Sequence, residues 1–245
     1  MKDGRRNTAS ELNDMLRKVF GGLPRGIVFD CDGVLVDSEA ANLAYYGMLR
    51  RELSLPPLTE DQSRYCQMSS VAQAIDYIIP KALQPCLKDI MAKCSYKKEI
   101  EPLIGPAAHI HALLDFCAAA GIRLGVFTNR VDPLDDMFSN CGLTGYFDPV
   151  VTVGPIPPKP DPAGLFIIAG EWGLKNTDML FIGDSSTDRD AAVAAVIPFL
   201  AYRNPSLTED GFCGDFADLL EALKGMDQTF ADKTKRCNGR QGTAI

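Results

Sequence analysis

The distribution of apolar residues constrains the fold of this chain more than any other feature of its sequence. Continuous apolar runs of strand length, most of them ending in a polar residue, occur at residues 26–30, 122–128, 179–184 and, more weakly, 149–153. Helical patterns, in which apolar residues recur every three or four positions, occur between them at residues 107–120, 133–141 and 162–172. Strands that alternate with helices and are apolar on both faces form parallel sheets covered by helices. The sequence therefore predicts an α/β fold with a doubly wound, Rossmann-like parallel sheet.

Turn residues mark the expected ends of these helices. Asp132-Pro133 and Asp161-Pro162 each place an aspartate before a proline, which is the order favoured where a helix begins. Glycines follow three of the helical patterns, at positions 121, 142 and 173. A further helix is expected at residues 12–20, which could dock on its own domain or on another subunit, and we favour its own domain.

Residues 38–103 interrupt the alternation, because they contain no convincing strand pattern. Helices are expected at 39–53 and 86–99, and Thr59 and Ser70 each begin a capping-box pattern with a glutamine three residues later. We therefore expect a small all-helical cap, inserted after the first strand and able to hinge on its two connections. The predicted domains are the α/β core at 1–37 and 104–226, the cap at 38–103 and a polar tail at 227–245.

The composition excludes several classes of protein. The 32 acidic residues outnumber the 25 basic ones, which gives a net charge of −7 and argues against a nucleic-acid-binding protein with a basic face. No apolar run reaches the length of about 18 to 20 residues that a membrane helix needs, and residues 1–20 contain no signal-like apolar stretch. The eight cysteines form no CxxC pair and are expected to be reduced. We expect a cytoplasmic protein that binds neither nucleic acid nor membrane, as a monomer or a homodimer.

Acidic residues end or follow two of the expected strands. Asp30 and Asp32 belong to the first strand end, and Asp184 and Asp188 to a later one. Because ligands of parallel sheets bind at the carboxyl ends of the strands, these side chains are expected at one site, together with Thr128. Like charges about 4 Å apart repel by roughly 4 kcal/mol at an effective dielectric constant near 20, and Mg²⁺ relieves this repulsion. Any one of the acids is compatible with a helix cap or a turn, but the four together favour a metal site.

Four motifs resemble those of the haloacid dehalogenase-like hydrolase superfamily, in its branch with a small helical cap after the first strand. The motifs are Phe29-Asp30-Cys31-Asp32-Gly33-Val34, Val126-Phe127-Thr128-Asn129, Lys159-Pro160-Asp161-Pro162 and Gly183-Asp184-Ser185-Ser186-Thr187-Asp188. The resemblance covers about residues 26–223. Each motif alone is weak to moderate, but the four together, in the family's order, are a strong signal.

The resemblance implies a catalytic role for each matching residue. Asp30 would attack phosphorus and form an aspartyl-phosphate, which divides one difficult hydrolysis into two steps. Asp32 would protonate the leaving oxygen and then activate water. Thr128 and the backbone N–H of Asn129 would hold the phosphoryl oxygens. Lys159 would neutralise charge on Asp30 and on the phosphate.

The resemblance also implies Mg²⁺ as the cofactor. The Asp30 side chain, the Asp32 backbone carbonyl and the Asp184 side chain would ligate the ion, and Asp188 would do so directly or through water. Lys159 is the one cation that we expect beside Asp30, Asp184 and Asp188.

Substrate contacts are less clearly marked in the sequence. The segment from Cys66 to Ser70 resembles the part of related caps that reaches the site, so Gln67 and Ser69 are candidates for contact with the substrate. Arg130, just after the second motif, is another candidate. Arg64 is expected to be a simple helix-face charge.

Several residues are interpreted as structural. Cys31 is expected to pack into the sheet rather than to react. His109 and His111 are expected at the surface of a helix rather than at a metal. The helix expected after the fourth motif, at 190–198, lacks the glycine usually found near its end in the family.

Together, these features predict a Mg²⁺-dependent phosphatase that hydrolyses a small soluble phosphomonoester, such as phosphoglycolate or a sugar phosphate. Dehalogenases and phosphonate hydrolases of the superfamily lack the second acid of the first motif, so Asp32 disfavours both. A phosphomutase of the β-phosphoglucomutase type stays an alternative, although Asn42 stands where the related mutases carry a histidine. The other alternative is a catalytically idle binding protein on the same fold.

Overall fold

The computed structural model describes residues 8–67, 71–93, 99–131, 133–207 and 212–227, which divide into two compact units. Unit 1 takes its described residues from Met1–Leu35, Ala107–Asp135 and Leu143–Ile245. Unit 2 takes its described residues from Val36–Pro106 and Asp136–Gly142. Among the described helices, none has the length and apolar character required to cross a membrane.

Unit 1 contains a six-stranded sheet with the order β5-β4-β1-β6-β7-β8. The strands are β1 (Gly26–Phe29), β4 (Arg123–Thr128), β5 (Val150–Thr152), β6 (Met179–Gly183), β7 (Phe199–Tyr202) and β8 (Phe212–Cys213). Every neighbouring pair is parallel, which confirms the predicted parallel α/β sheet. β1 lies between β4 and β6, with Phe29 paired to Val126 on one side and to Ile182 on the other.

Two strands of this sheet were not predicted from the sequence. β7 has four residues and follows Pro198 directly, and β8 has only two residues. β8 is too short to show a pattern, whereas β7 is an apolar run as long as β1 and was a local signal available in the sequence. Both extend the sheet on the side of β6.

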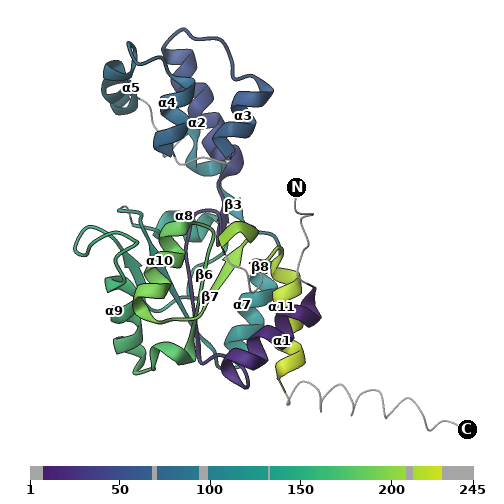
Figure 1. The fold of residues 1–245 in the computed structure, drawn as a ribbon. Helices are drawn as coiled ribbons and strands as arrows, with labels where there is room; N and C mark the ends of the chain where they lie inside the picture. The colour runs from purple at the N-terminus through teal and green to yellow at the C-terminus, as the bar shows by residue number, and fades with distance from the viewer. Residues whose placement is uncertain (1–7, 68–70, 94–98, 132, 208–211, 228–245) are drawn as a thin grey trace, which may run out of the picture. The chain divides into compact units, whose positions relative to one another are not determined.

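Helices cover both faces of the sheet (Figure 1). The helices on one face are α1 (Ala9–Phe20), α7 (Ile110–Ala119) and α11 (Phe216–Met226), and those on the other are α9 (Ala163–Trp172) and α10 (Ser186–Ala195). Alternate side chains of β1 face opposite sides of the sheet. Val28 belongs to the apolar core beneath α9 and α10, and the ring of Phe29 contacts that of Phe216 on α11. The short 3-10 helices η3 (Asn176–Asp178) and η4 (Pro205–Leu207) complete unit 1.

The N-terminal helix docks on its own unit, as predicted. The Asn13 side-chain amide donates a hydrogen bond to the Ala222 carbonyl on α11 (2.7 Å), and Leu12 and Leu16 are buried. α1 begins three residues earlier than the apolar pattern indicates, because Thr8 and Glu11 form a capping box.

Several helix boundaries differ from those expected. α7 begins at Ile110 rather than 107, because His109 has a left-handed backbone (φ 62°). α9 begins at Ala163, one residue after the expected start at 162, and the Ala163 N–H donates to the Asp161 carboxylate (2.9 Å). α8 (Asp135–Asn140) begins two residues after Pro133, and Asp132 lies outside the described residues. The glycines expected at helix ends, Gly121, Gly142 and Gly173, all have positive φ.

Unit 2 is mainly helical. Its helices are α2 (Glu39–Glu52), α3 (Glu60–Gln67), α4 (Val71–Ile78), α5 (Leu87–Lys93), α8 and the 3-10 helices η1 (Gln84–Cys86) and η2 (Glu101–Leu103). Thr59 and Gln62 form the expected capping box at α3, whereas Ser70 lies outside the described residues. β2 (Val36–Asp37) and β3 (Gly105–Pro106) pair antiparallel, so the two chain segments that enter and leave the insertion are hydrogen-bonded to each other.

Candidate active site

Three predicted site residues lie together because their strands are neighbours. Asp30 follows β1, Thr128 ends β4 and Asp184 follows β6. The Asp30 N–H donates to the Ile182 carbonyl of β6 (2.9 Å), which continues the strand pairing past the end of β1. The carboxyl ends of these strands therefore bring Asp30, Thr128 and Asp184 to one edge of the sheet.

Lys159 lies at the centre of the acids. Its ammonium Nζ is 2.7 Å from Asp30 Oδ1 and 2.5 Å from Asp188 Oδ1, and it donates to the Phe127 carbonyl at 3.2 Å. The side chain is only 2% exposed, although it comes from a proline-rich loop. The ring centroids of Phe127 and Phe181 lie 5.5 and 5.8 Å from the ammonium Nζ. Lys159 is therefore a buried cation that joins two carboxylates.

Asn129 holds the loop that carries Lys159. Its Oδ1 accepts a hydrogen bond from the Lys159 N–H (2.7 Å), and its Nδ2 donates to the Lys159 carbonyl (3.3 Å). Sequence reasoning assigned only the backbone N–H of Asn129, toward phosphate, and that role stays a prediction. The side chain has a positioning role that the sequence did not indicate.

Burial and neighbouring carboxylates raise the pKa values of Asp30 and Asp184. Burial raises the pKa of Asp30 to about 7; the Lys159 ammonium opposes this shift, and the carboxylates of Asp188 and Asp184 add to it. Burial, followed by the Asp188 carboxylate, raises the pKa of Asp184 to about 6. Burial lowers the pKa of Lys159, but Asp30 and Asp188 outweigh that effect, so that its pKa lies above the usual value and the amine stays charged. The site thus holds more negative charge than one lysine balances.

Asp188 is fixed by the start of α10. The N-cap residue Ser185 accepts a hydrogen bond from the Asp188 N–H (3.2 Å), and both its own N–H (3.0 Å) and its hydroxyl (2.5 Å) donate to Asp188 Oδ2. Because Lys159 binds Oδ1, both carboxylate oxygens of Asp188 accept hydrogen bonds. Sequence reasoning missed Ser185, although its spacing to Asp188 fits a capping box.

Two glycines allow the acids to approach the backbone closely. Gly33 has a positive φ of 76°, and a Cβ atom there would overlap the Asp184 carboxylate. A Cβ atom at Gly183 would overlap the side chain of Asp188. Gly33 therefore turns the chain just after the two acids of the first motif, and the requirement for glycine at position 183 was not predicted. Asn204, also missed, donates to the Asp184 carbonyl (2.9 Å).

The acidic cluster fits a divalent cation. Asp30, Asp184 and Asp188 each offer one carboxylate oxygen, and these three oxygens lie within 4.8 Å of one another. Asp30 and Asp188 are buried, and Gly33 leaves the approach to Asp184 clear of a side chain. Mg²⁺ prefers such an all-oxygen ligand set.

Asp32 pairs with an arginine. Arg130 Nη1 lies 2.8 Å from Asp32 Oδ1, and the two side chains are 19% and 44% exposed. Arg130 is therefore a second cation among the site residues, and its partner Asp32 is not one of the three acids beside which Lys159 was the expected cation. The pairing places Arg130 beside a predicted catalytic acid, consistent with a position at the mouth of the site.

The other residues singled out in the sequence either have side chains outside the described part of the chain or have structural roles. Only the backbone of Gln67 is described, at the end of α3, and Ser69 lies outside the described residues. Cys31 is buried, and burial together with the Asp32 and Asp30 carboxylates raises its pKa well above the usual value, so it stays a thiol. The six described cysteines are all free. His109 is exposed and pairs with Asp215 (2.6 Å).

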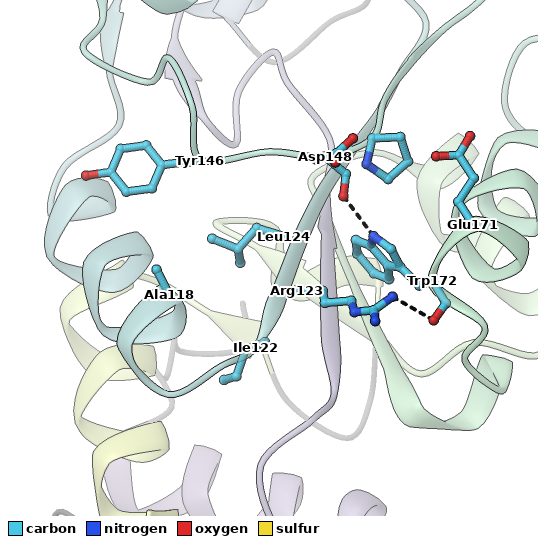
Figure 2. A pocket seen from close by; sticks show the side chains of 9 residues that line it. Ala118, Ile122, Arg123, Leu124, Tyr146, Asp148, Glu171 and Trp172 are labelled. Atoms are coloured by element: carbon cyan, nitrogen blue, oxygen red, sulfur yellow. Dashed lines mark hydrogen bonds between the residues drawn. The ribbon is translucent and has the colours of Figure 1, made fainter.

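A hollow of about 380 Å³ lies at the opposite edge of the sheet, between α7 and α9 (Figure 2). Trp172 forms one wall: its indole N–H donates to the Asp148 carbonyl (2.8 Å), and its own carbonyl accepts from Arg123 (2.6 Å). Cβ atoms at Gly26 or Gly125 would overlap the indole ring, so strand glycines make room for it. Arg123 begins β4, so this hollow opens at the amino ends of the strands and is separate from the acids.

Comparison with known proteins agrees with this site. Residues 27–202 match the family model described as haloacid dehalogenase-like hydrolase. A phosphoglycolate phosphatase of Yersinia pestis is 28% identical over 219 residues, which cover 81% of this chain and 93% of the relative. Another phosphoglycolate phosphatase, from Escherichia coli K12, is 28% identical over 203 residues, which cover 71% of this chain and 79% of the relative.

Solved structures lead to the same family. A haloacid dehalogenase-superfamily hydrolase from Geobacter sulfurreducens is 30% identical with a TM-score of 0.71, covering 83% of this chain and 98% of that one. A protein from Haemophilus somnus described as a predicted phosphoglycolate phosphatase shares the fold at 23% identity, with a TM-score of 0.64, covering 83% of this chain and 97% of that one. The chain belongs to the haloacid dehalogenase-like hydrolase family. It is an enzyme of the phosphatase class, as predicted.

Proposed function

We propose that the protein hydrolyses a small phosphomonoester of the phosphoglycolate type, with Mg²⁺ as cofactor and an aspartyl-phosphate intermediate. The observation that carries the proposal is the buried Lys159 ammonium between Asp30 and Asp188, next to the strand end that holds Thr128. A fixed cation beside a carboxylate nucleophile stabilises charge that develops on a transferring phosphoryl group. The relatives named phosphoglycolate phosphatase, which align over most of the chain, support this substrate class.

In the first step, an Asp30 carboxylate oxygen attacks phosphorus, and the bond from phosphorus to the ester oxygen breaks. Asp32 gives its proton to that oxygen, so the leaving oxygen departs as a hydroxyl group. Lys159 stays charged and holds Asp30 in place through the 2.7 Å contact. The Thr128 hydroxyl and the Asn129 N–H bind the phosphoryl oxygens.

In the second step, water attacks the phosphorus of the aspartyl-phosphate. Asp32, now ionised, takes a proton from that water, and the bond between phosphorus and the Asp30 oxygen breaks. Inorganic phosphate leaves, and both aspartates return to their starting state. The same residue therefore serves as acid and then as base.

When bound, Mg²⁺ neutralises the acids and the phosphoryl oxygens as the nucleophile approaches. The Asp30 and Asp184 carboxylates and the Asp32 carbonyl would hold it. Both Asp188 oxygens already accept hydrogen bonds from Lys159 and Ser185, so Asp188 is suited to hold the ion through water.

The helical insertion expected at residues 38–103 is proposed to act as a cap that selects small substrates and excludes water. The pairing of β2 with β3 supports a defined hinge, because it ties both connections together. Water is the proposed acceptor, since Asn42 stands where the related mutases have a histidine and the chain has no histidine between residues 38 and 103. A cytoplasmic location and a small phosphorylated metabolite as the partner belong to the same proposal.

A phosphate-release screen against phosphorylated metabolites in Mg²⁺ tests this function. We expect release from small phosphomonoesters by the wild type and none by Asp30→Asn. Asp190→Asn is the matched control, because Asp190 is an exposed acid on α10 that pairs with Arg189. Faster interconversion of glucose 1-phosphate and glucose 6-phosphate than phosphate release would identify a mutase instead. An absence of turnover with all substrates would favour the idle binding protein.

A further inference from the structure

The ion pair between Asp32 and Arg130 has a consequence for substrate choice. A guanidinium in this position already binds one carboxylate oxygen, at 2.8 Å. Asp32 and Arg130 follow the ends of the neighbouring strands β1 and β4, and both side chains are partly open to solvent. The Asp32 carboxylate is therefore the group that an anionic substrate would have to displace from Arg130.

We propose that Arg130 selects phosphomonoesters that carry a carboxylate, and that the substrate carboxylate replaces Asp32 on the guanidinium. This inference rests on the proposed phosphatase function. Exchange of one carboxylate for another keeps the charge-assisted hydrogen bond of Arg130. The exchange also releases Asp32 from Arg130, so that its carboxylate can take a proton from solvent water and turn toward the leaving oxygen.

The backbone around Arg130 is fixed relative to the phosphate site. The Arg130 N–H donates to the Thr128 hydroxyl (3.2 Å), and the Arg130 carbonyl accepts from the Val153 N–H (3.1 Å). The arginine is thus tied on one side to a predicted phosphate ligand and on the other to the segment after β5. Because Arg130 is held beside Thr128, only a substrate whose carboxylate lies close to its phosphoryl group can contact both residues.

The other cation of the site is not suited to this task. Lys159 is 2% exposed and lies between Asp30 and Asp188, two side chains that are themselves buried. Asp32 is 44% exposed, so water is available to it when the pair opens. Arg130 is therefore the cation whose partner can be exchanged.

Neutral substrates would lack this advantage. A sugar hydroxyl offers no charge, so replacing Asp32 with it would exchange a charge-assisted hydrogen bond for a weaker neutral one. Arg130 would then stay with Asp32, and the acid would be released less often. The expected substrate class is a short phosphomonoester with a carboxylate, such as phosphoglycolate, rather than a neutral sugar phosphate.

The test compares two substrates of nearly equal size, phosphoglycolate and 2-hydroxyethyl phosphate, which has a CH₂OH group in place of the carboxylate. We expect the wild type to prefer phosphoglycolate in kcat/KM. Arg130→Gln should lower kcat/KM for phosphoglycolate by about 10- to 100-fold. It should not lower kcat/KM for 2-hydroxyethyl phosphate, because Asp32 is then no longer held by a guanidinium. Arg130→Lys should retain part of the preference. Arg25→Gln, which removes an exposed arginine paired with Asp178, is the matched control and should leave both values unchanged.

The other outcomes would contradict either the role of Arg130 or the phosphatase function. Equal kcat/KM of the wild type for the two substrates, or an unchanged preference in Arg130→Gln, would contradict the role of Arg130 and leave the phosphatase function intact. An equal loss for both substrates would mean that Arg130 only positions Asp32, which also contradicts selection. Failure of the wild type to release phosphate from either compound would overturn the proposed function itself. Thermal melting of each variant checks folding, and Arg130→Lys decides if Arg130→Gln does not fold.

Discussion

The Lys159 ammonium lies 2.5 Å from Asp188 Oδ1, and the two side chains are only 2% and 0% exposed. A buried lysine is costly unless its charge is paired and hydrogen-bonded, and Asp188 supplies that partner in addition to Asp30. Asp188 itself is held by the capping box of α10. The start of one helix therefore fixes the cation on which the nucleophile depends.

Replacement of Asp188 by alanine should affect both stability and activity. The change removes one partner of a buried ion pair and one half of a capping box, so we expect a loss of about 2 to 4 kcal/mol in the free energy of unfolding. Activity should fall at least roughly 10²-fold, because Lys159 loses its position. Urea denaturation and phosphate release measure the two effects. Asp190→Ala, at an exposed site on the same helix, should stay within about 0.5 kcal/mol of the wild type, and similar values for both variants would refute the role of the pair.

The metal-free protein should become less stable as the pH rises from about 4 to 8. Burial raises the pKa values of Asp30 to about 7 and of Asp184 to about 6, so the folded state binds protons that the unfolded chain has already lost. Stability therefore falls as the pH rises through this window, by up to about 1.4 kcal/mol per pH unit for each group.

Chemical denaturation with a chelator present, repeated across this pH range, measures the effect. Asp184→Asn should show a shallower decline than the wild type, because its side chain does not titrate. Parallel pH profiles of the two proteins would mean that Asp184 does not carry a raised pKa.

Mg²⁺ should stabilise the fold through the same acids. A ligand that binds only the folded state adds RT ln(1 + [L]/Kd), which is about 2.7 kcal/mol at a hundred times Kd. Chelation should abolish activity and lower the melting temperature, and added Mg²⁺ should restore both. Thermal melting of Asp184→Asn should show little of this shift, although its metal-free melting temperature is expected to rise. An equal Mg²⁺ shift in both proteins would place the metal elsewhere.

A substitution at the C-terminal end of α10 should stabilise the protein. Val196 has a left-handed backbone (φ 55°) and a 71% exposed side chain, at the position where the sequence lacks the expected glycine. A left-handed residue with a Cβ costs about 1 to 2 kcal/mol, so Val196→Gly should raise the free energy of unfolding by roughly 1 kcal/mol.

Val193→Gly is the matched control for this change. Val193 is a similarly exposed valine, but it lies inside α10, where glycine is unfavourable, so urea denaturation should show a loss of stability. If both glycine substitutions destabilise the protein alike, the conformation of Val196 is not strained.

The strand ends could be predicted from the sequence because each depends on a short, local pattern. The apolar runs before Asp30, Thr128 and Asp184 identified three central strands, and parallel pairing then required their carboxyl ends to meet. The helix boundaries at His109 and Ala163 were missed by a few residues, because backbone conformation and a side-chain hydrogen bond decide them.

The contacts within the site could not be predicted in the same way. Arg130 and Asp32 are 98 residues apart in the sequence, and Asn129 and Lys159 are 30 apart, so these contacts depend on how separate loops fold. Ser185 is different, since its three-residue spacing to Asp188 is a local signal that was available.

The identity of the nucleophile is tested most directly by mass spectrometry of enzyme quenched in acid during turnover with phosphoglycolate and Mg²⁺. The proposed mechanism predicts a peptide carrying one additional phosphoryl group, located on Asp30 by fragmentation, and its absence in Asp30→Asn. A phosphoryl group on another residue, or undiminished phosphate release by Asp30→Asn, would contradict nucleophilic catalysis by Asp30.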